Sequence, residues 1–264
     1  MKAVEKELIF NLLKNAGAVA NGGFVPSNFA STPVFEDDVS KPAPEAQITV
    51  EVGATSQSPV PPSADSLGAQ SDAGAVTIES LSSRILKCTH CQLARTRTNV
   101  VPGEGVPNPD VLVIGEGPGY DEDMQGRPFV GKAGILLDKM LAAINLDRKT
   151  NCFIANIVKC RPPQNRDPFP EEQEACFSFL EAQIKILKPK MILCMGRISG
   201  HKMLNSEEPV GKLHGNFFEY NGIPLMITYH PSALLRNQEL KRPAWEDLKK
   251  FRAKLDSLTG GSQQ

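Results

Sequence analysis

The sequence predicts a three-layer α/β/α sandwich with a central, mainly parallel four-stranded sheet, preceded by a disordered N-terminal extension. Two observations favour this fold class. After residue 80, apolar β-branched runs alternate with helical stretches, a pattern typical of parallel strands joined by crossover helices. Between residues 17 and 80, the chain is rich in Pro, Ala, Ser, Gly and acidic residues and has too few apolar side chains to form a core.

The four predicted strands are nearly continuous in apolar residues, as expected of parallel strands that are buried on both faces. They span residues 110–115, 152–158, 191–196 and 224–229. Ligands in such sheets bind beyond the carboxyl ends of the strands, so the loops that follow these strands should converge on one crevice. These loops cover 115–131, 156–167, 196–200 and 229–236.

Helices are expected at residues 134–144, 170–187 and 244–255. The second has the clearest start, because Pro170 suits the first turn of a helix and Glu171 and Glu172 complement the positive end of its dipole. The globular domain is therefore assigned to residues 81–258, followed by a flexible tail at 259–264.

The N-terminal extension is divided into a short amphipathic helix within residues 1–16 and a disordered linker over residues 17–80. Leu8, Leu12 and Leu13 could dock this helix on a protein partner, and a frayed helix without a partner is the alternative. The sequence has no apolar run of about 20 residues that would cross a membrane, and no secretory signal. We therefore expect a cytoplasmic protein that does not bind a membrane. We also expect it to be a monomer.

Charge is divided unevenly along the chain. Residues 1–80 contain four basic and ten acidic side chains, a net charge of −6, whereas residues 81–264 contain 25 basic and 20 acidic side chains, a net charge of +5. A basic surplus of this size fits a surface that contacts phosphates, and a solvated charged exterior is the alternative.

Four of the six cysteines are candidate metal ligands, namely Cys88, Cys91, Cys160 and Cys176. The first two form a CxxC pair. Cys152 and Cys194 fall in the apolar strand runs and are expected to be buried small hydrophobes. Nothing indicates an oxidising compartment, so disulfides are disfavoured. The spacing leaves a structural zinc, a [4Fe–4S] cluster or scattered structural thiols, and the lack of a second CxxC favours the cluster.

Four loop motifs occupy the predicted crevice. They read GlyGluGlyProGly (115–119), GlnGlyArgProPheValGlyLysAlaGly (125–134), AsnIleValLysCysArgProProGlnAsnArg (156–166) and HisProSer (230–232). In this order they closely resemble the motifs of the family 4 uracil-DNA glycosylases, the iron–sulfur-containing type of bacteria and archaea. The resemblance covers residues 84–255. It implies an enzyme that flips uracil out of DNA and hydrolyses its N-glycosidic bond, which leaves an abasic site and begins base-excision repair.

The resemblance also implies roles for individual residues. They are Glu116, Asn165 and His230 for catalysis, Gly117, Phe129 and Asn156 for binding the base, and Cys88, Cys91, Cys160 and Cys176 for the [4Fe–4S] cluster. In the family, the histidine donates to uracil O2, the phenyl ring stacks on the extruded base, and the asparagine of the second strand reads its Watson–Crick edge.

These roles are chemically reasonable. Breaking the bond leaves negative charge on the departing base and oxocarbenium character on the sugar, so the enzyme must stabilise a uracil anion. A side-chain amide both accepts from N3–H and donates to O4 of uracil, whereas cytosine presents the opposite pattern. Taken singly, Phe129 could instead belong to the core, His230 could be a bonded strand-end histidine, and the asparagines could bond their own loops.

Three further expectations concern the rim of the crevice. Some related glycosylases carry an aspartate where this loop has Gly117, so Asn165, with Glu116 nearby, is the candidate for orienting water. Glu122 is expected to crowd the 5-position of the base and so exclude thymine. DNA contacts are expected from Ser232, Arg236, Arg161 and Arg166, and also from Lys241 and Arg242.

Two other functions fit the same sequence less fully. One is a non-catalytic DNA-binding or polymerase-associated module on the same fold, in which the acidic extension recruits a partner. The other is a zinc-stabilised nucleotide-binding protein, since a glycine-rich loop after a strand presents backbone N–H groups to any anion.

Overall fold

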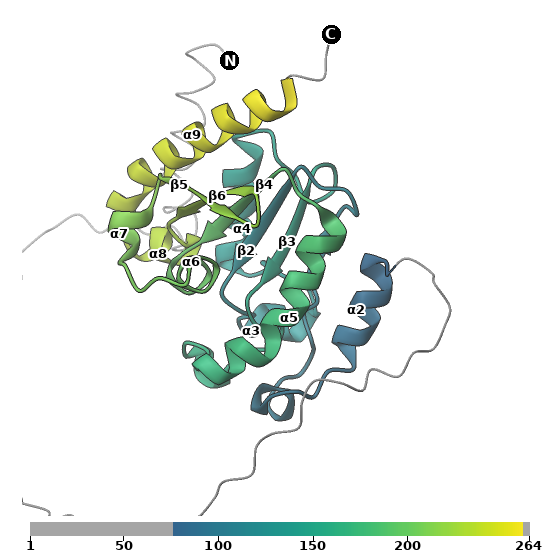
Figure 1. The fold of residues 1–264 in the computed structure, drawn as a ribbon. Coiled ribbons are helices and arrows are strands. Elements are labelled where there is room, and N and C mark those ends of the chain that lie inside the picture. The colour runs from purple at the N-terminus through teal and green to yellow at the C-terminus, as the bar shows by residue number, and fades with distance from the viewer. Residues whose placement is uncertain (1–75, 261–264) are drawn as a thin grey trace, which may run out of the picture. The chain divides into compact units, whose positions relative to one another are not determined.

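A six-stranded sheet forms the centre of the protein in the computed structural model, which describes residues 76–260 (Figure 1). Its strand order is β1-β3-β2-β4-β6-β5. The four inner strands are parallel, and the edge strands β1 and β5 pair antiparallel with β3 and β6. The strands are β1 (Glu104–Gly105), β2 (Val111–Gly115), β3 (Cys152–Asn156), β4 (Met191–Met195), β5 (Phe217–Tyr220) and β6 (Ile223–Thr228).

The predicted α/β class and mainly parallel sheet are confirmed, but the predicted number of four strands is wrong. The four predicted strands are the inner ones. The two edge strands were missed for different reasons: β1 has only two residues, and β5 alternates exposed and half-buried side chains, so it lacks the continuous apolar run of an inner strand.

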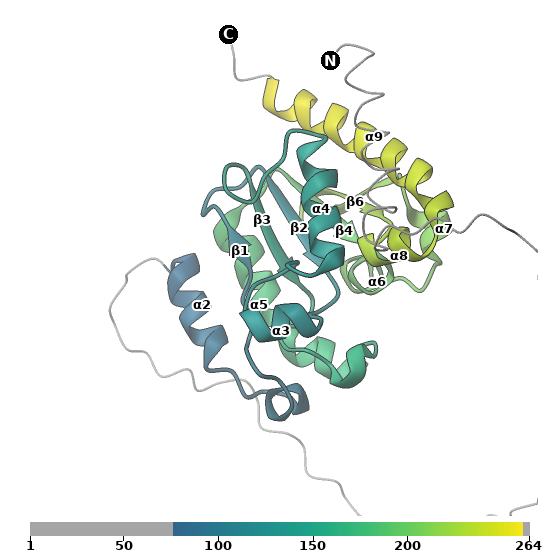
Figure 2. The same cartoon turned by 180° about the vertical axis from the view of Figure 1, so that it is seen from behind.

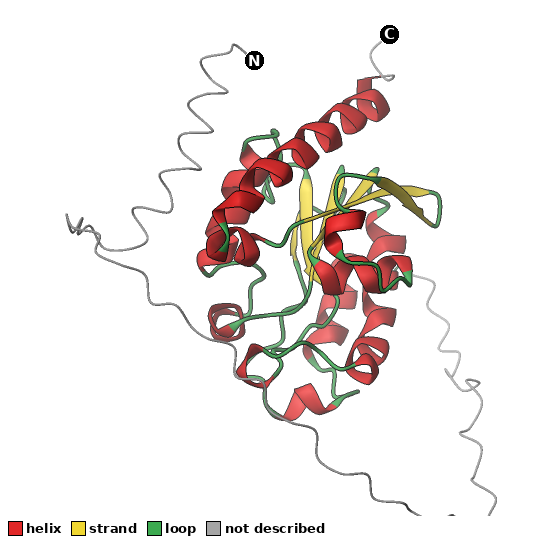
Figure 3. Ribbon diagram, turned by 90° about the vertical axis from the view of Figure 1, so that its left-hand side faces the viewer, coloured by secondary structure: helices red, strands yellow, loops and turns green. Residues whose placement is uncertain are grey.

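Helices cover both faces of the sheet, which gives the predicted three layers (Figures 2 and 3). Buried side chains of α2, α5, α6 and α7 pack on one face, and those of α4, α8 and α9 pack on the other. The helices are α2 (Ile78–Leu86), α3 (Tyr120–Gln125), α4 (Lys132–Ala142), α5 (Pro170–Leu187), α6 (Arg197–Leu204), α7 (Val210–Leu213), α8 (Pro231–Arg236) and α9 (Lys241–Thr259). Three short 3-10 helices, at Gln92–Arg95, Pro163–Asn165 and Gln238–Leu240, complete the described elements.

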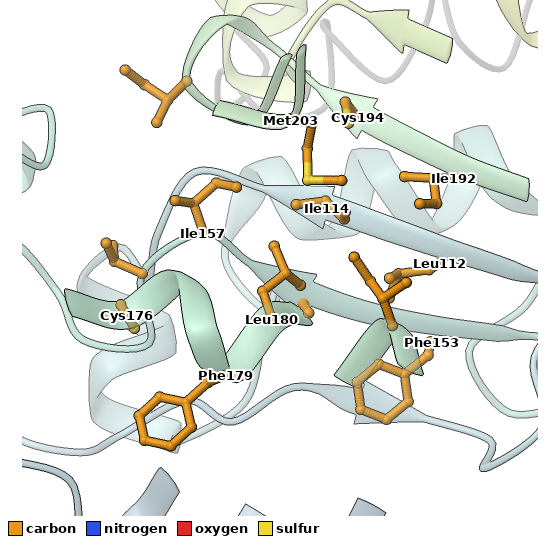
Figure 4. Packing of buried hydrophobic residues seen from close by; sticks show 14 of the residues in the cluster. Leu112, Ile114, Phe153, Ile157, Cys176, Phe179, Leu180, Ile192, Cys194 and Met203 are labelled. Carbon is orange, nitrogen blue, oxygen red and sulfur yellow. The ribbon is translucent and has the colours of Figure 1, made fainter. Parts of the chain in front are cut away.

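The two cores follow from the two-residue period of a strand. In β2, Leu112 and Ile114 face α5 and α6, whereas Val111 and Val113 face α4 and α9. The first core continues past the ends of the strands to Ile157 and to Cys176 on α5 (Figure 4). The inner strands are therefore fixed from both sides, and the loops at their carboxyl ends start from rigid positions.

The ends of the domain differ from the sequence-based expectation. Helix α2 begins at Ile78, inside the range assigned to the linker, because the Thr77 hydroxyl accepts from the Ser80 N–H and the Ser80 hydroxyl accepts from the Thr77 N–H. Helix α9 reaches Thr259, one residue into the predicted tail. The predicted N-terminal helix, almost all of the linker and residues 261–264 lie outside the described residues. None of the described helices is long and apolar enough to cross a membrane.

Candidate active-site cleft and cysteine site

A cleft of about 700 Å³ lies at the carboxyl ends of the inner strands. The topology places it there, because the chain leaves β2 for β3 on one side and reaches β4 on the other, a switch point where open sheets form crevices. All four predicted loops contribute to its wall. The cleft brings together the five residues on which the predicted site depends, Glu116, Phe129, Asn156, Asn165 and His230.

Asn156 is the last residue of β3 and is only 2% exposed. Its backbone carbonyl accepts a hydrogen bond of 2.8 Å from the buried Lys159 Nζ, and a Cβ at Gly115 would lie 2.4 Å from its Oδ1. Among the described residues, this Oδ1 is the one buried side-chain nitrogen or oxygen atom without a hydrogen-bond partner. Leaving a buried acceptor unpaired costs about 1–3 kcal/mol. The cleft therefore holds a buried side-chain amide whose oxygen can accept a hydrogen bond from a ligand.

The Phe129 ring forms a flat wall of the cleft and is 6% exposed. Its backbone has φ +52°, in the left-handed region that bulky residues rarely adopt. Two glycines allow this geometry: a Cβ at Gly134 would lie 2.0 Å from the Phe129 carbonyl group, and one at Gly115 would lie 2.6 Å from the ring. The ring centre lies 5.6 Å from that of His230.

His230 follows β6 and caps α8. Its Nδ1 accepts from the Ser232 N–H at 3.1 Å and lies 2.8 Å from the Ser232 hydroxyl oxygen. A backbone N–H can only donate, so Nδ1 is unprotonated and the neutral ring carries its proton on Nε2. Burial, and secondarily the charge of Arg236, lower the pKa of His230 to about 4. At neutral pH His230 is therefore an uncharged Nε2–H donor, consistent with the donor role predicted for it.

Glu116 directly follows β2 and is half-buried in the cleft. Burial, and then the neighbouring charge of Asp167, raise the pKa of Glu116 to about 7, although Arg197 and Arg236 act in the opposite direction. The folded protein therefore holds this carboxyl group partly ionised near neutral pH, in a place where a carboxylate is costly without a cationic partner.

This pKa predicts how the stability depends on pH. Between about pH 4.5 and 7, the unfolded chain loses the Glu116 proton before the folded protein does, so stability falls as the pH rises through this window. Glu116→Gln should raise the free energy of unfolding by about 1–2 kcal/mol at pH 8 and much less at pH 5. Urea unfolding at both pH values measures this difference. Glu219→Gln, on the exposed side of β5, is the control, and an equal gain at both pH values would contradict the pKa.

Asn165 lies at the exposed rim of the cleft, where Gln164 and Asn165 have φ values of 55° and 56°. Its Oδ1 accepts a 2.7 Å hydrogen bond from Arg161 Nε, and the guanidinium of Arg161 also lies 5.1 Å from the centre of the Tyr120 ring. The amide NH₂ is the group that Asn165 can turn into the cleft. Arg161 does not itself line the cleft. Its side chain orients Asn165, and its contact with DNA stays a prediction.

Two other charged residues of the cleft loops, Glu122 and Arg166, have hydrogen-bond partners within the chain. Both oxygens of Glu122 are used in the chain's own turns: Oε2 accepts from the Gly119 N–H at 3.1 Å, and Oε1 accepts from the Val130 and Gly131 N–H groups at 2.9 and 3.0 Å. Glu122 therefore ties the loop at 115–119 to the turn that carries Phe129. It also lines the cleft, and its crowding of the 5-position of the base stays a prediction.

Arg166 lines the cleft but is engaged elsewhere. Its guanidinium makes a bidentate ion pair with Glu172 at 2.7 and 2.9 Å and lies 3.7 Å from the centre of the Phe169 ring. This arrangement fixes the start of α5. The DNA contact of Arg166 stays a prediction. Ser232 and Arg236 do line the cleft, as their predicted role requires.

The sequence analysis missed four charged residues of the cleft, Asp121, Lys132, Asp167 and Arg197, of which the last two form an ion pair. Arg197 begins α6 directly after β4, inside a loop already expected to reach the crevice, so its position in the sequence was the available signal. Gly196 before it has φ +89°, and a Cβ there would lie 2.8 Å from the His230 Cβ. The close approach of these two strand ends thus depends on a glycine.

The four candidate ligand cysteines line a separate small cavity. Three N–H groups point at their sulfur atoms: Arg97 Nη1 lies 3.1 Å from Cys160 Sγ, the Lys159 N–H 3.3 Å from Cys176 Sγ, and the His90 N–H 3.5 Å from Cys88 Sγ. All six cysteines are free thiols. Cys152 and Cys194 are fully buried within β3 and β4, as predicted.

Lys159 lies between the cysteine cavity and the cleft. It is only 1% exposed, and its Nζ donates to the Asn156 carbonyl at 2.8 Å and to Gln183 Oε1 at 2.7 Å. Burial lowers the pKa of Lys159 to about 8, against the opposing influence of Cys176 and Cys160. The strand end that carries Asn156 is thus braced from the cysteine side.

Comparison with known proteins identifies the family. Residues 102–249 match the model of the uracil DNA glycosylase superfamily. The type-4 uracil-DNA glycosylase of Thermotoga maritima is 44% identical over 180 residues, which cover 67% of this chain and 93% of the relative. Those of Sulfurisphaera tokodaii and Archaeoglobus fulgidus are 41% and 37% identical, over 67% and 66% of this chain and 84% and 92% of the relatives. The chain therefore belongs to the uracil DNA glycosylase superfamily, and within it to the type-4 uracil-DNA glycosylases.

Proposed function

We propose that this protein is a uracil-DNA glycosylase, which hydrolyses the N-glycosidic bond of uracil in DNA and so initiates base-excision repair. The observation that carries the proposal is the unpaired Oδ1 of Asn156, buried in a cleft with the Phe129 ring and the His230 donor. An acceptor, a flat apolar face and a neutral N–H donor are what an extruded pyrimidine with an N3–H group and an O2 acceptor requires.

Selection of uracil rests on Asn156 in this proposal. Its Oδ1 accepts from uracil N3–H, and its NH₂ group donates to O4. Cytosine has an unprotonated N3 and an amino group at position 4, so it would place acceptor against acceptor and donor against donor. The Phe129 ring replaces part of the stacking energy that the base loses on leaving the duplex.

Cleavage of the bond is promoted at both of its ends. The Nε2–H of His230 donates to O2, where negative charge gathers as the base departs, and it keeps its proton because the ring is already neutral. Ionised Glu116 stabilises the positive charge that develops on the sugar. Asn165, held by Arg161, orients the water that captures the sugar cation, and this water needs little activation when departure is dissociative.

We propose that Cys88, Cys91, Cys160 and Cys176 hold a [4Fe–4S] cluster at the cysteine cavity. All four thiols line it. The Cys160 sulfur accepts from the Arg97 guanidinium, and the Cys176 sulfur accepts from the backbone N–H of Lys159. The lack of a second CxxC departs from the usual pattern of a zinc site and favours the cluster over tetrahedral zinc. The cluster would brace the loops at the end of β3, since hydrolysis has no redox step.

Loss of one ligand should release this cluster. Cys160→Ala is expected to lower the iron bound per chain severalfold, to remove most of the visible cluster absorption and to lower the yield of folded protein. Iron analysis and the absorption spectrum of anaerobically purified protein measure this. Cys194→Ala removes a thiol buried in the same core and is the matched control. Full iron retention in Cys160→Ala would overturn the ligand assignment.

DNA contacts are assigned to the cleft rim, where Ser232, Arg236 and Arg197 lie around the base site. Such contacts hold phosphates without reading sequence. Arg197 would exchange Asp167 for a phosphate when DNA binds. We further propose that the protein acts as a monomer in the cytoplasm, and that its N-terminal segment recruits a protein partner.

Incubation with a uracil-containing oligonucleotide, followed by alkali to cleave abasic sites, tests the function directly. Strand cleavage at the uracil, and none in an oligonucleotide with thymine or cytosine at that position, is the expected result. An intact uracil strand at stoichiometric enzyme would reject catalysis. Tight DNA binding in that case would leave a non-catalytic DNA-binding module on the same fold.

A further inference from the structure

The turn that carries Phe129 is held by two side chains of opposite charge, the half-buried Glu122 and the buried Arg148. Glu122 accepts from the N–H groups that follow Phe129. On the other side, Arg148 donates from Nη1 to the Pro128 carbonyl at 2.8 Å and from Nη2 to the Phe129 carbonyl at 3.0 Å. The guanidinium therefore donates to two consecutive carbonyl groups at the point where the backbone enters its left-handed conformation. A residue in this conformation costs about 1–3 kcal/mol, which the surrounding contacts must offset.

Arg148 is built into this position. It is 8% exposed, and Asp138 on α4 accepts from its Nη2 at 2.7 Å and from its Nε at 3.2 Å. Glu104 lies 3.8 Å from its Nη1. The planar fork of an arginine can meet two carbonyls and a carboxylate together, whereas the single ammonium of a lysine cannot keep all of these directions.

The Phe129 turn also has space to move. A second cavity of about 430 Å³ lies behind it, lined by Phe129 itself and by Arg148, Asp138 and Ile135. Phe129 thus separates this cavity from the active-site cleft. Without the two hydrogen bonds from Arg148, the strained turn could relax toward the second cavity and draw the Phe129 ring away from the base.

We propose that Arg148 is a positioning residue for base stacking, which fixes the Phe129 ring at the height where it contacts the flipped pyrimidine. The proposal rests on the glycosylase function proposed above. In the proposal Arg148 affects excision through Phe129, because the carbonyl groups that its side chain binds belong to this turn. Arg148 should therefore matter only when the ring is present.

A double-mutant cycle tests this dependence. Arg148→Lys is expected to lower the single-turnover excision rate about tenfold, and Phe129→Ala by a similar or larger factor. The double variant should be no slower than Phe129→Ala alone. Binding to DNA that already carries an abasic site should be unchanged in Arg148→Lys, because no base remains to be stacked. Arg252→Lys, which alters a guanidinium that donates to the Ile144 carbonyl, should excise uracil at the wild-type rate.

Additive effects in the double variant, or an equal loss of affinity for abasic DNA, would overturn the proposal and leave Arg148 a purely structural residue. If Arg148→Lys fails to fold, Asp138→Asn replaces it, since this exposed side chain can be changed without opening the core. It should slow excision about threefold, and only when Phe129 is present. Absence of excision by the wild-type protein would instead reject the glycosylase function, so the two failures are distinguishable.

Discussion

Asn156→Asp is expected to lower the rate of uracil excision about 10³-fold. The substitution keeps the size of the side chain but replaces its NH₂ group with an oxygen. A carboxylate can accept from uracil N3–H, but it meets uracil O4 with repulsion, and its burial without a cation raises its cost further. Loss of two hydrogen-bond equivalents of about 2 kcal/mol each gives a factor near 10³.

The measurement is single-turnover excision from matched oligonucleotides that contain uracil or cytosine. The ratio of uracil to cytosine excision should fall along with the uracil rate, because the aspartate no longer donates to position 4. Asn216→Asp, an exposed amide that lies outside the cleft lining, is the control for an added charge. If Asn156→Asp excised uracil at an undiminished rate, the reading of the base edge would have to come from another residue.

The sequence predicted the inner sheet and the location of the cleft, because these depend on local patterns. An inner parallel strand is apolar along its whole length, and its carboxyl end must meet the ends of its neighbours. Glu116, Asn156 and His230 could be placed in one cavity on this ground together with the family resemblance, and the structure brings them there.

The partners of charged residues could not be predicted in the same way. Glu122, Arg161 and Arg166 are polar residues in cleft loops, and from the sequence each could face a ligand. In the structure their side chains form hydrogen bonds with Gly131, Asn165 and Glu172, and these partners come together only when the loops are folded. A charged side chain in a loop can support the fold, contact a ligand or do both, and only the folded structure shows which partners within the chain it has.

The cleft also concentrates features that reduce stability. Asn156 keeps an unpaired acceptor, Phe129 keeps a left-handed backbone, and Glu116 holds its carboxyl group where ionisation is costly. Each of these features lowers the stability of the folded protein without a ligand, and contacts with a bound ligand offset this cost, as is common at functional sites. The two buried cores on either side of the sheet supply the rigidity that keeps this arrangement in place.

His230→Ala should lower the rate of the chemical step about 10²–10³-fold, the usual loss when one donor to a developing anion is removed. Affinity for uracil-containing DNA should change much less, because the donor matters most when charge gathers on O2. Single-turnover rates and equilibrium binding measure the two effects. His201→Ala, whose ring contacts the Glu208 carbonyl outside the cleft lining, is the control. Comparable losses in rate and affinity would show that His230 serves binding alone.

The pH dependence separates a neutral donor from a general acid. With a pKa of about 4, His230 stays uncharged above about pH 5, so it should add no acid limb to the rate profile between pH 5 and 8. The rate should instead rise through about pH 7 as Glu116 ionises, and this rise should vanish in Glu116→Gln. A loss of rate with a midpoint near pH 6.5 that disappears in His230→Ala would contradict the neutral donor, since it would mean that an imidazolium supplies the proton.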